Sequence, residues 1–128
     1  MSRRVLWVAK CIDRPGSSSA EKRKEHMEEH FSYIETIIDC IAFAGPLTSE
    51  GGDKIIGSML AFKTEELQKA QLWLSQDPYF SCEIWEKTEW SRFVASAGDL
   101  VGGITWWIAS NQDNYLDVLF FNSIFWDN

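Results

Sequence analysis

The stretch SSAEKRKEHMEEHFSYIETIID, residues 18–39, is predicted to be one amphipathic helix around which the rest of the chain is arranged. Its apolar side chains recur at the i, i+4, i+7 and i+11 positions that fall on one stripe of a helix. They are Met27, Phe31, Ile34 and Ile38. Ser18, followed three residues later by Glu21, predicts a capping box at the first turn.

Both histidines of the chain, His26 and His30, lie on this predicted helix. Arg23 precedes His26 by three residues, and side chains at that spacing are neighbours on a helix surface. We therefore expect the polar chemistry of the protein to start on this helix.

The composition predicts a single domain with a real apolar core. The chain has 128 residues, of which 45% are hydrophobic and 14% aromatic. Its net charge of −7 is unevenly distributed, because residues 98–128 hold four acidic side chains and no Lys or Arg. Nucleic acids and anionic membranes both require clustered basic residues. We therefore expect neither as a partner.

The cysteines are Cys11, Cys40 and Cys82, an odd number without CxxC spacing. Their apolar neighbours predict buried thiols in a reducing compartment rather than disulfides. The apolar run after Met1 is short and is broken by Lys10, which does not fit a signal peptide. We expect a cytoplasmic protein.

The apolar pattern predicts four strands and two helices. The strands are Val5–Ile12, Ile41–Leu47, Lys54–Phe62 and Cys82–Phe93, and the second helix begins at Thr64. The order strand, helix, strand, strand, helix, strand predicts an α+β, ferredoxin-like fold with a four-stranded antiparallel sheet. Two helices cover only one face of such a sheet, yet the first strand is apolar on both sides. A second copy of the chain, packed sheet to sheet, is the simplest cover, so a homodimer is expected.

Residues 98–128 form a separate, unusually apolar extension of the domain in residues 1–97. None of its apolar runs approaches the ~20 residues that span a bilayer. So much exposed apolar surface is a liability, so we expect the extension to pack on its own domain or on the partner. A mobile extension remains an alternative.

Four short motifs occur in order along these elements. They are Arg23-Lys24-Glu25-His26, Gly45-Pro46, Gly57-Ser58 and Asp77-Pro78-Tyr79. This series resembles the YciI-like family of the dimeric α/β-barrel (ferredoxin-like) superfamily, which also holds muconolactone isomerases. The resemblance covers about residues 4–93. It fails in the extension and at Glu83, where the family often has glycine.

The resemblance implies a histidine–aspartate pair in a cleft next to the dimer interface. On this chain the pair is His26 and Asp77, with Arg23, Ser58 and Tyr79 nearby. One branch similar to the family is a cofactor-free dehydrochlorinase acting on chlorinated hydroxyquinols. The resemblance thus implies a cofactor-free reaction class rather than a particular substrate. No metal is expected either, since the histidines do not match the zincin motif.

These residue types suit proton transfer on a small cyclic or aromatic metabolite, by elimination, isomerisation or decarboxylation. A histidine titrates near neutrality and can take up and return a proton, while an aspartate fixes its tautomer. In this hypothesis His26 is the base or acid, Asp77 orients it, and Arg23 with Ser58 stabilises an oxyanion. Aromatic side chains are expected to line an apolar pocket for the ring; they are Trp7, Phe62, Tyr79 and Trp85.

Each residue also has a purely structural interpretation. His26 can be a solvated helix residue, and His30 a histidine at the edge of the core with a local hydrogen bond. Asp77 can cap a turn that begins with Pro78. Gly57-Ser58 can mark a bulge, and Arg23 can pair with Glu21. His26 and His30 have a metal-ligand spacing, but Met27 stands where the zincin motif has glutamate.

The second functional hypothesis is a non-catalytic module that binds a small ligand or another protein. Here Trp106-Trp107 and Phe120-Phe121 of the extension would form the contact surface. Truncation before residue 98 separates the hypotheses, because only the module would lose binding while the dimer survives. If the extension only completes the dimer, the same truncation should give monomers or aggregates.

Overall fold

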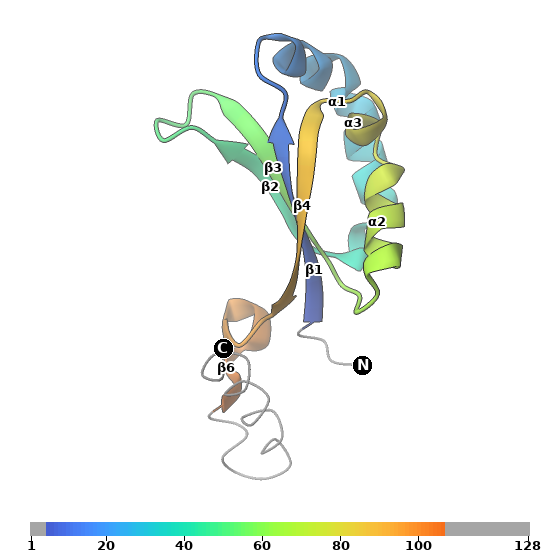
Figure 1. Cartoon of the computed structure of the whole chain (residues 1–128). Helices are drawn as coiled ribbons and strands as arrows, with labels where there is room; N and C mark the ends of the chain where they lie inside the picture. Colours follow the sequence, from blue (N-terminus) through green and yellow to red (C-terminus); the bar gives the residue numbers. More distant parts are fainter. Residues whose placement is uncertain (1–4, 107–128) are drawn as a thin grey trace. The chain divides into compact units, whose positions relative to one another are not determined.

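The structure is a computed structural model that describes residues 5–106, and its described residues form two compact units, 5–93 and 94–106. The larger unit is an α/β sandwich (Figure 1). Its elements are β1 (Val5–Asp13), α1 (Ser18–Thr36), η1 (Ile38–Cys40), β2 (Ile41–Thr48), β3 (Ile55–Phe62), α2 (Leu67–Ser75), α3 (Pro78–Ser81) and β4 (Trp85–Val94).

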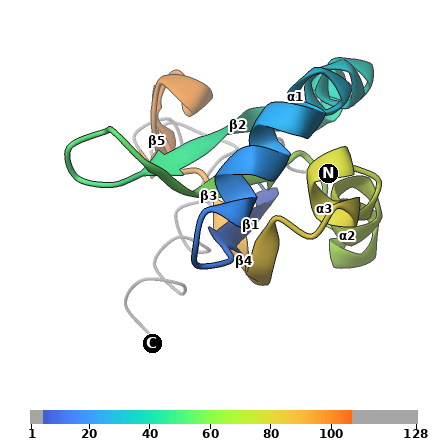
Figure 2. The same cartoon turned by 90° about the horizontal axis from the view of Figure 1, so that it is seen from above.

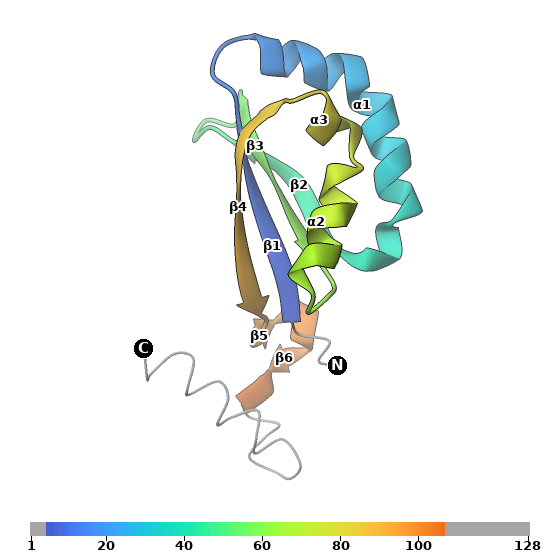
Figure 3. The ribbon, with the colours of Figure 1, turned by 45° about the vertical axis from the view of Figure 1, so that its right-hand side comes forward.

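The four strands form one sheet in the order β2-β3-β1-β4, with β3 antiparallel to both β1 and β2. The three α-helices lie against one face of this sheet, as Figure 3 shows. This arrangement confirms the predicted α+β, ferredoxin-like fold. Seen from above, α1 runs beside the pair formed by α2 and α3 (Figure 2).

The register of the sheet fixes which side chains face the helices. Cys11 of β1 lies opposite Ser58 of β3, and Ser58 lies opposite Pro46 of β2. Two residues along, Leu60 of β3 lies opposite Ala44 of β2. Because successive side chains alternate between the faces of a sheet, these residues share one face.

The main core lies between this face and the helices α2 and α3. Ala70 and Leu74, four residues apart on α2, are both buried, so they lie on the face of α2 that packs in the core. The buried cluster consists of Ala9, Cys11, Ile41, Leu60, Phe62, Ala70, Leu74, Tyr79, Ile84 and Trp85.

The ends of the helices differ from the prediction. The capping box is wrong, because α1 begins after Ser17 without a side-chain cap. Instead the hydroxyl of Ser19, inside the first turn, lies 3.0 Å from the carbonyl oxygen of Ile84 and 3.2 Å from that of Arg14. The second helix begins at Leu67 rather than at Thr64, whose hydroxyl accepts a hydrogen bond from the Glu66 amide.

Gly57 is required by the close approach of two strands. A Cβ atom at this position would collide with the carbonyl oxygen of Cys11 on β1 and press on the Leu47 side chain of β2. The glycine inside the predicted strand therefore marks a backbone contact. The adjacent Ser58 is held on β3 in a fixed position.

The face of the sheet away from the helices carries apolar side chains. Phe43 and Phe93 are exposed, and Met59 is half-buried. Phe43 lies opposite Ala61 of β3, whose other neighbour is Val8. None of the helices of the larger unit covers this face (Figure 3).

The smaller unit holds a short hairpin of β5 (Ala97–Gly98) and β6 (Gly103–Ile104), joined by η2 (Asp99–Val101). Gly98, Gly102 and Gly103 have the positive φ angles that such a tight connection needs. Trp107, Phe120 and Phe121 lie outside the described residues. Among the helices described, none is long and apolar enough to cross a membrane.

Candidate active site

The centre of the candidate site is a pair formed by His30 and Asp77. Asp77 is 1% exposed and is the N-cap of α3, where its Oδ1 accepts a hydrogen bond of 2.9 Å from the Tyr79 amide. The same oxygen lies 2.8 Å from Nδ1 of His30 on α1. The predicted cap at Asp77-Pro78 is therefore confirmed, and the carboxylate also contacts an imidazole.

Tyr79 holds the imidazole in place from the other side. Its ring stacks on that of His30, with centroids 3.9 Å apart and planes 8° from parallel. Its hydroxyl donates a 3.2 Å hydrogen bond to the Arg23 carbonyl oxygen. Burial raises the pKa of Tyr79, so the phenol stays neutral near pH 7.

Arg23 is buried beside this pair and is neutralised by Asp13, not by Glu21. Its Nε and Nη2 bind the two carboxylate oxygens of Asp13 at 3.1 and 2.7 Å. Nη2 also donates a 3.0 Å hydrogen bond to the Ser58 hydroxyl. Because Ser58 accepts this bond, its own proton is available to a ligand, and no described residue is its acceptor.

A cavity of about 440 Å³, here called the α1 cavity, lies between α1 and the strands β2 and β3. Its polar walls are Arg23, Lys24, His30, Ser58 and Tyr79. Its apolar walls are Met27, Phe31, Ile34, Ala44, Gly45, Pro46, Ile55 and Leu60. Among the described residues no Asp or Glu lines it, although the chain has 19 acidic side chains.

His30, rather than His26, contacts Asp77, so the predicted His26–Asp77 pair is wrong. Nδ1 of His26 lies 3.3 Å from a carboxylate oxygen of Glu29 on the same helix. At about 100° per residue, His30 falls on the same side of α1 as Arg23, whereas His26 is turned away by about 60°. The seven-residue spacing of Arg23 and His30 is the sequence signal that favours the right histidine.

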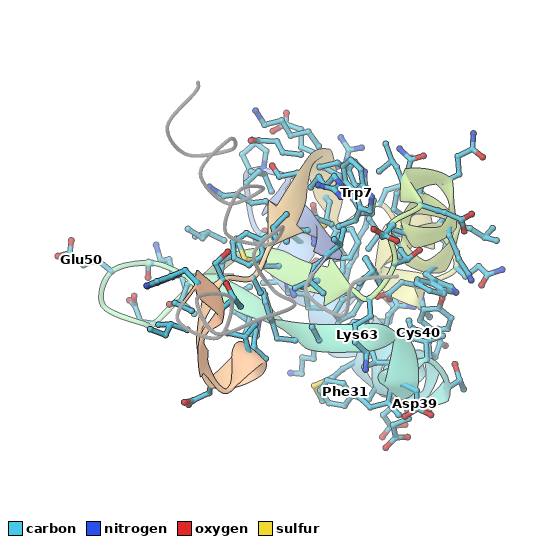
Figure 4. All side chains as sticks on the ribbon, turned by 90° about the horizontal axis from the view of Figure 1, so that it is seen from below. Trp7, Phe31, Asp39, Cys40, Glu50 and Lys63 are labelled. Carbon is cyan, nitrogen blue, oxygen red and sulfur yellow. The ribbon has the colours of Figure 1, made fainter. Side chains whose placement is uncertain are left out.

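The predicted aromatic lining is correct only at Tyr79. Phe62 and Trp85 are buried in the core, where Trp85 packs edge-on against Tyr79. Nε1 of Trp7 donates a 3.0 Å hydrogen bond to the Glu65 carbonyl oxygen. Figure 4 shows Trp7 on the α2 side and Phe31 on α1, with Glu50 at the tip of the β2–β3 loop. Phe31 is the aromatic wall that the sequence interpretation did not assign to the site.

Two of the three thiols, those of Cys11 and Cys82, are unsuited to this chemistry. Burial raises the pKa of Cys11 to about 12, and burial also raises the pKa of Cys82. Both are therefore protonated near neutral pH and are poor nucleophiles. Within residues 5–106 no three His, Cys, Asp or Glu side chains gather into a metal-binding group.

This chain is similar to one known protein in sequence and to another in fold. It is 30% identical over 92 residues to the Xenovulene A biosynthesis cluster protein asL2 of Sarocladium schorii, covering 65% of this chain and 80% of that protein. The fold is similar to that of 5-chloro-2-hydroxyhydroquinone dehydrochlorinase (TftG) from Burkholderia phenoliruptrix AC1100, in complex with 2,5-dihydroxybenzoquinone. That likeness has a TM-score of 0.61 at 24% identity and covers 73% of this chain and 95% of the other.

The YCII-related domain matches residues 5–94, which include both members of the His30–Asp77 pair and every residue that lines the α1 cavity. The chain belongs to the YCII-related domain family.

Proposed function

We propose that this protein is a cofactor-free lyase or isomerase that transfers a proton on a small hydroxylated ring compound in the α1 cavity. The observation that carries the proposal is the 2.8 Å contact between His30, which lines the α1 cavity, and the fully buried Asp77, which does not. A non-catalytic binding protein needs the cavity but has no need of an oriented base.

The base is Nε2 of His30. The carboxylate of Asp77 accepts a hydrogen bond from Nδ1–H of His30, so the neutral imidazole has its lone pair at Nε2, where it can take a substrate proton. The stacked ring of Tyr79 fixes the plane of the imidazole. Once Nε2 has taken the proton, the carboxylate of Asp77 stabilises the imidazolium. A positioned base of this kind contributes about 10²–10⁴-fold to a rate.

Ser58 and Arg23 stabilise the charge that develops on the substrate oxygen. The hydroxyl of Ser58 donates to the oxygen, and the guanidinium beside it adds a positive charge in a largely apolar space. The electron pair left by the proton is thus held as an enolate or phenolate. The enolate or phenolate can then expel a leaving group, or it can accept a proton at another carbon and so shift a double bond.

The names of the related proteins support this reaction class. Dehydrochlorination, the reaction named for the structural neighbour, removes HCl from a hydroxylated ring. That step needs a base and an oxyanion site but no redox partner. The relative from Sarocladium schorii is named for a biosynthesis cluster, which is consistent with a small-molecule substrate.

Deuterium exchange into simple ring compounds tests the proposal and does not require the natural substrate. A panel of di- and trihydroxybenzenes is incubated with the full chain in D2O, and exchange at ring carbons is followed by NMR. We expect catalysed exchange with at least one compound and a loss of about 100-fold or more in His30→Ala.

His26→Ala is the matched control, because it removes the same side chain one turn away on the same helix. We expect its exchange rate to stay within about twofold of wild type, since His26 does not line the α1 cavity and its hydrogen-bond partner is Glu29 on the same helix. Retained exchange in a folded His30→Ala protein contradicts the mechanism. Absence of exchange with every compound favours the binding module instead.

We also propose that the open face of the sheet pairs with a second copy of the chain. Phe43 and Phe93 are exposed on a face that the helices of the larger unit leave bare. A symmetric dimer would bury both side chains at once. Mass measurement in solution tests this, with a dimer expected for wild type and a folded monomer for the double variant Phe43→Arg, Phe93→Arg.

A further inference from the structure

The volume of the α1 cavity exceeds what one simple ring requires. The cavity measures about 440 Å³. An apolar cavity of ~150 Å³ is large enough to bind benzene. A ring bound at the catalytic pair therefore leaves more than half of the space for something else.

The cavity is also elongated along α1. Its lining residues on this helix run from Arg23 to Ile34, which at 1.5 Å per residue corresponds to about 16 Å. Those on β3 run from Ile55 to Leu60, which is about 17 Å in an extended strand. Both walls are longer than a single ring.

The polar side chains that line the cavity are confined to one part of this length, with the apolar Ile55 three residues before Ser58 on β3. Ser58 contacts Arg23 near the beginning of α1, and His30 lies about two turns further along the helix. Leu60 and Ala44 face each other two residues beyond Ser58 in the sheet, toward the end where α1 leads into β2. The end at Ile34, Ala44 and Leu60 thus has no polar side chain among the described residues that line it.

We propose that the substrate is amphiphilic: a phenolic or enolic ring that carries a large apolar substituent, such as an alkyl chain or a second ring. The ring oxygen lies at Ser58 and Arg23, within reach of His30. The substituent extends toward Ile34, Ala44 and Leu60. The identity of the ring rests on the proposed function, whereas the substituent follows from the size and polarity of the cavity.

Binding of 4-alkylphenols to the full chain, measured by isothermal titration calorimetry, tests the substituent. Each buried methylene adds about 0.8 kcal/mol, or about fourfold in affinity. From 4-methylphenol to 4-butylphenol we expect a gain of about 50-fold with one site per chain.

Ala44→Leu fills the apolar end and should remove most of this gain, while the affinity for 4-methylphenol stays within about twofold. Gln68→Leu places the same side chain on the exposed surface of α2 and should keep the full gain. Equal affinities for the two phenols in wild type overturn the proposal. So does a gain that survives Ala44→Leu.

His30→Ala separates this proposal from the proposed function. We expect this variant to lose deuterium exchange and to keep the dependence on chain length. Suppose that wild type catalyses exchange with simple dihydroxybenzenes but binds 4-methylphenol and 4-butylphenol equally. That result would overturn the amphiphilic substrate and leave the proposed function standing. Exchange retained in His30→Ala, with the gain intact, would overturn the mechanism and support the amphiphilic substrate.

Discussion

The space between the helices and the sheet is filled beneath α2 but left open beneath part of α1. Under α2, Leu74 is 2% exposed and packs in the cluster around Phe62. On α1 the buried residues are the polar Ser19 and Arg23, whereas Met27 and Phe31 remain 43% and 55% exposed. An amphipathic stripe therefore does not by itself indicate a packed interface. On α1 it lines a cavity.

The polar network explains why α1 does not close onto the strands. Arg23 needs its carboxylate partner on β1 and its hydroxyl partner on β3, and these bonds hold the helix through polar atoms. Burying Arg23 without them would cost several kcal/mol. The region beneath α2 therefore stabilises the fold, whereas the region beneath α1 forms a cavity lined by polar and apolar side chains.

The largest effect is expected for Asp77→Asn. Asp77 caps α3 in the packed region and contacts His30 on α1 beside the cavity. The amide oxygen can still accept from Tyr79 and His30, but the negative charge is lost. We expect exchange activity to fall by about 10²–10⁴-fold with the fold retained. Activity and circular dichroism, measured on the same sample, check this. A variant as active as wild type would mean that the carboxylate serves only as the cap of α3.

Leu74→Ala and Met27→Ala compare the two regions directly. The first empties a packed site and should lower the free energy of unfolding by about 2–5 kcal/mol. The second removes a half-exposed wall of the cavity and should cost less than about 1 kcal/mol. Urea denaturation measures both. Equal losses would show that the α1 side is packed as tightly as the α2 side.

The stability of the core should fall at alkaline pH through Cys11. Burial raises the pKa of its thiol from 9.0 to about 12, so the folded state holds this proton after the unfolded state has released it. The stabilisation is complete below pH 9 and is lost as the pH rises toward 12, at about 1.4 kcal/mol per pH unit. Urea titrations at pH 7, 9 and 10 should show a weaker decline in Cys11→Ala than in wild type.

The smallest effect is expected at Glu83, which has a φ angle of +63° between α3 and β4. A side chain is disfavoured in this left-handed conformation, whereas glycine adopts it freely. We expect Glu83→Gly to raise the free energy of unfolding by about 1 kcal/mol. A thermal melt measures the gain, with Glu86→Gly on β4 as the control that should destabilise.

The order of elements was predictable because the strands are short apolar runs bounded by turn residues, whereas apolar residues recur every three to four positions in the helices. Which histidine contacts Asp77 was indicated only by the spacing of Arg23 and His30, because the contact itself depends on where α3 presents Asp77 against α1. The assignment of Trp7, Phe62 and Trp85 to the cavity failed for a related reason. An apolar pattern predicts burial but does not distinguish a core from the wall of a cavity.

The exposed positions Met27 and Phe31 also determine how easily the specificity of the cavity can change. They face the α1 cavity while the fold rests on buried residues elsewhere, so larger or smaller side chains there alter which molecules fit without endangering folding. Substitutions at these two positions of one helix should therefore change which molecules the cavity accepts while the His30–Asp77 pair stays in place.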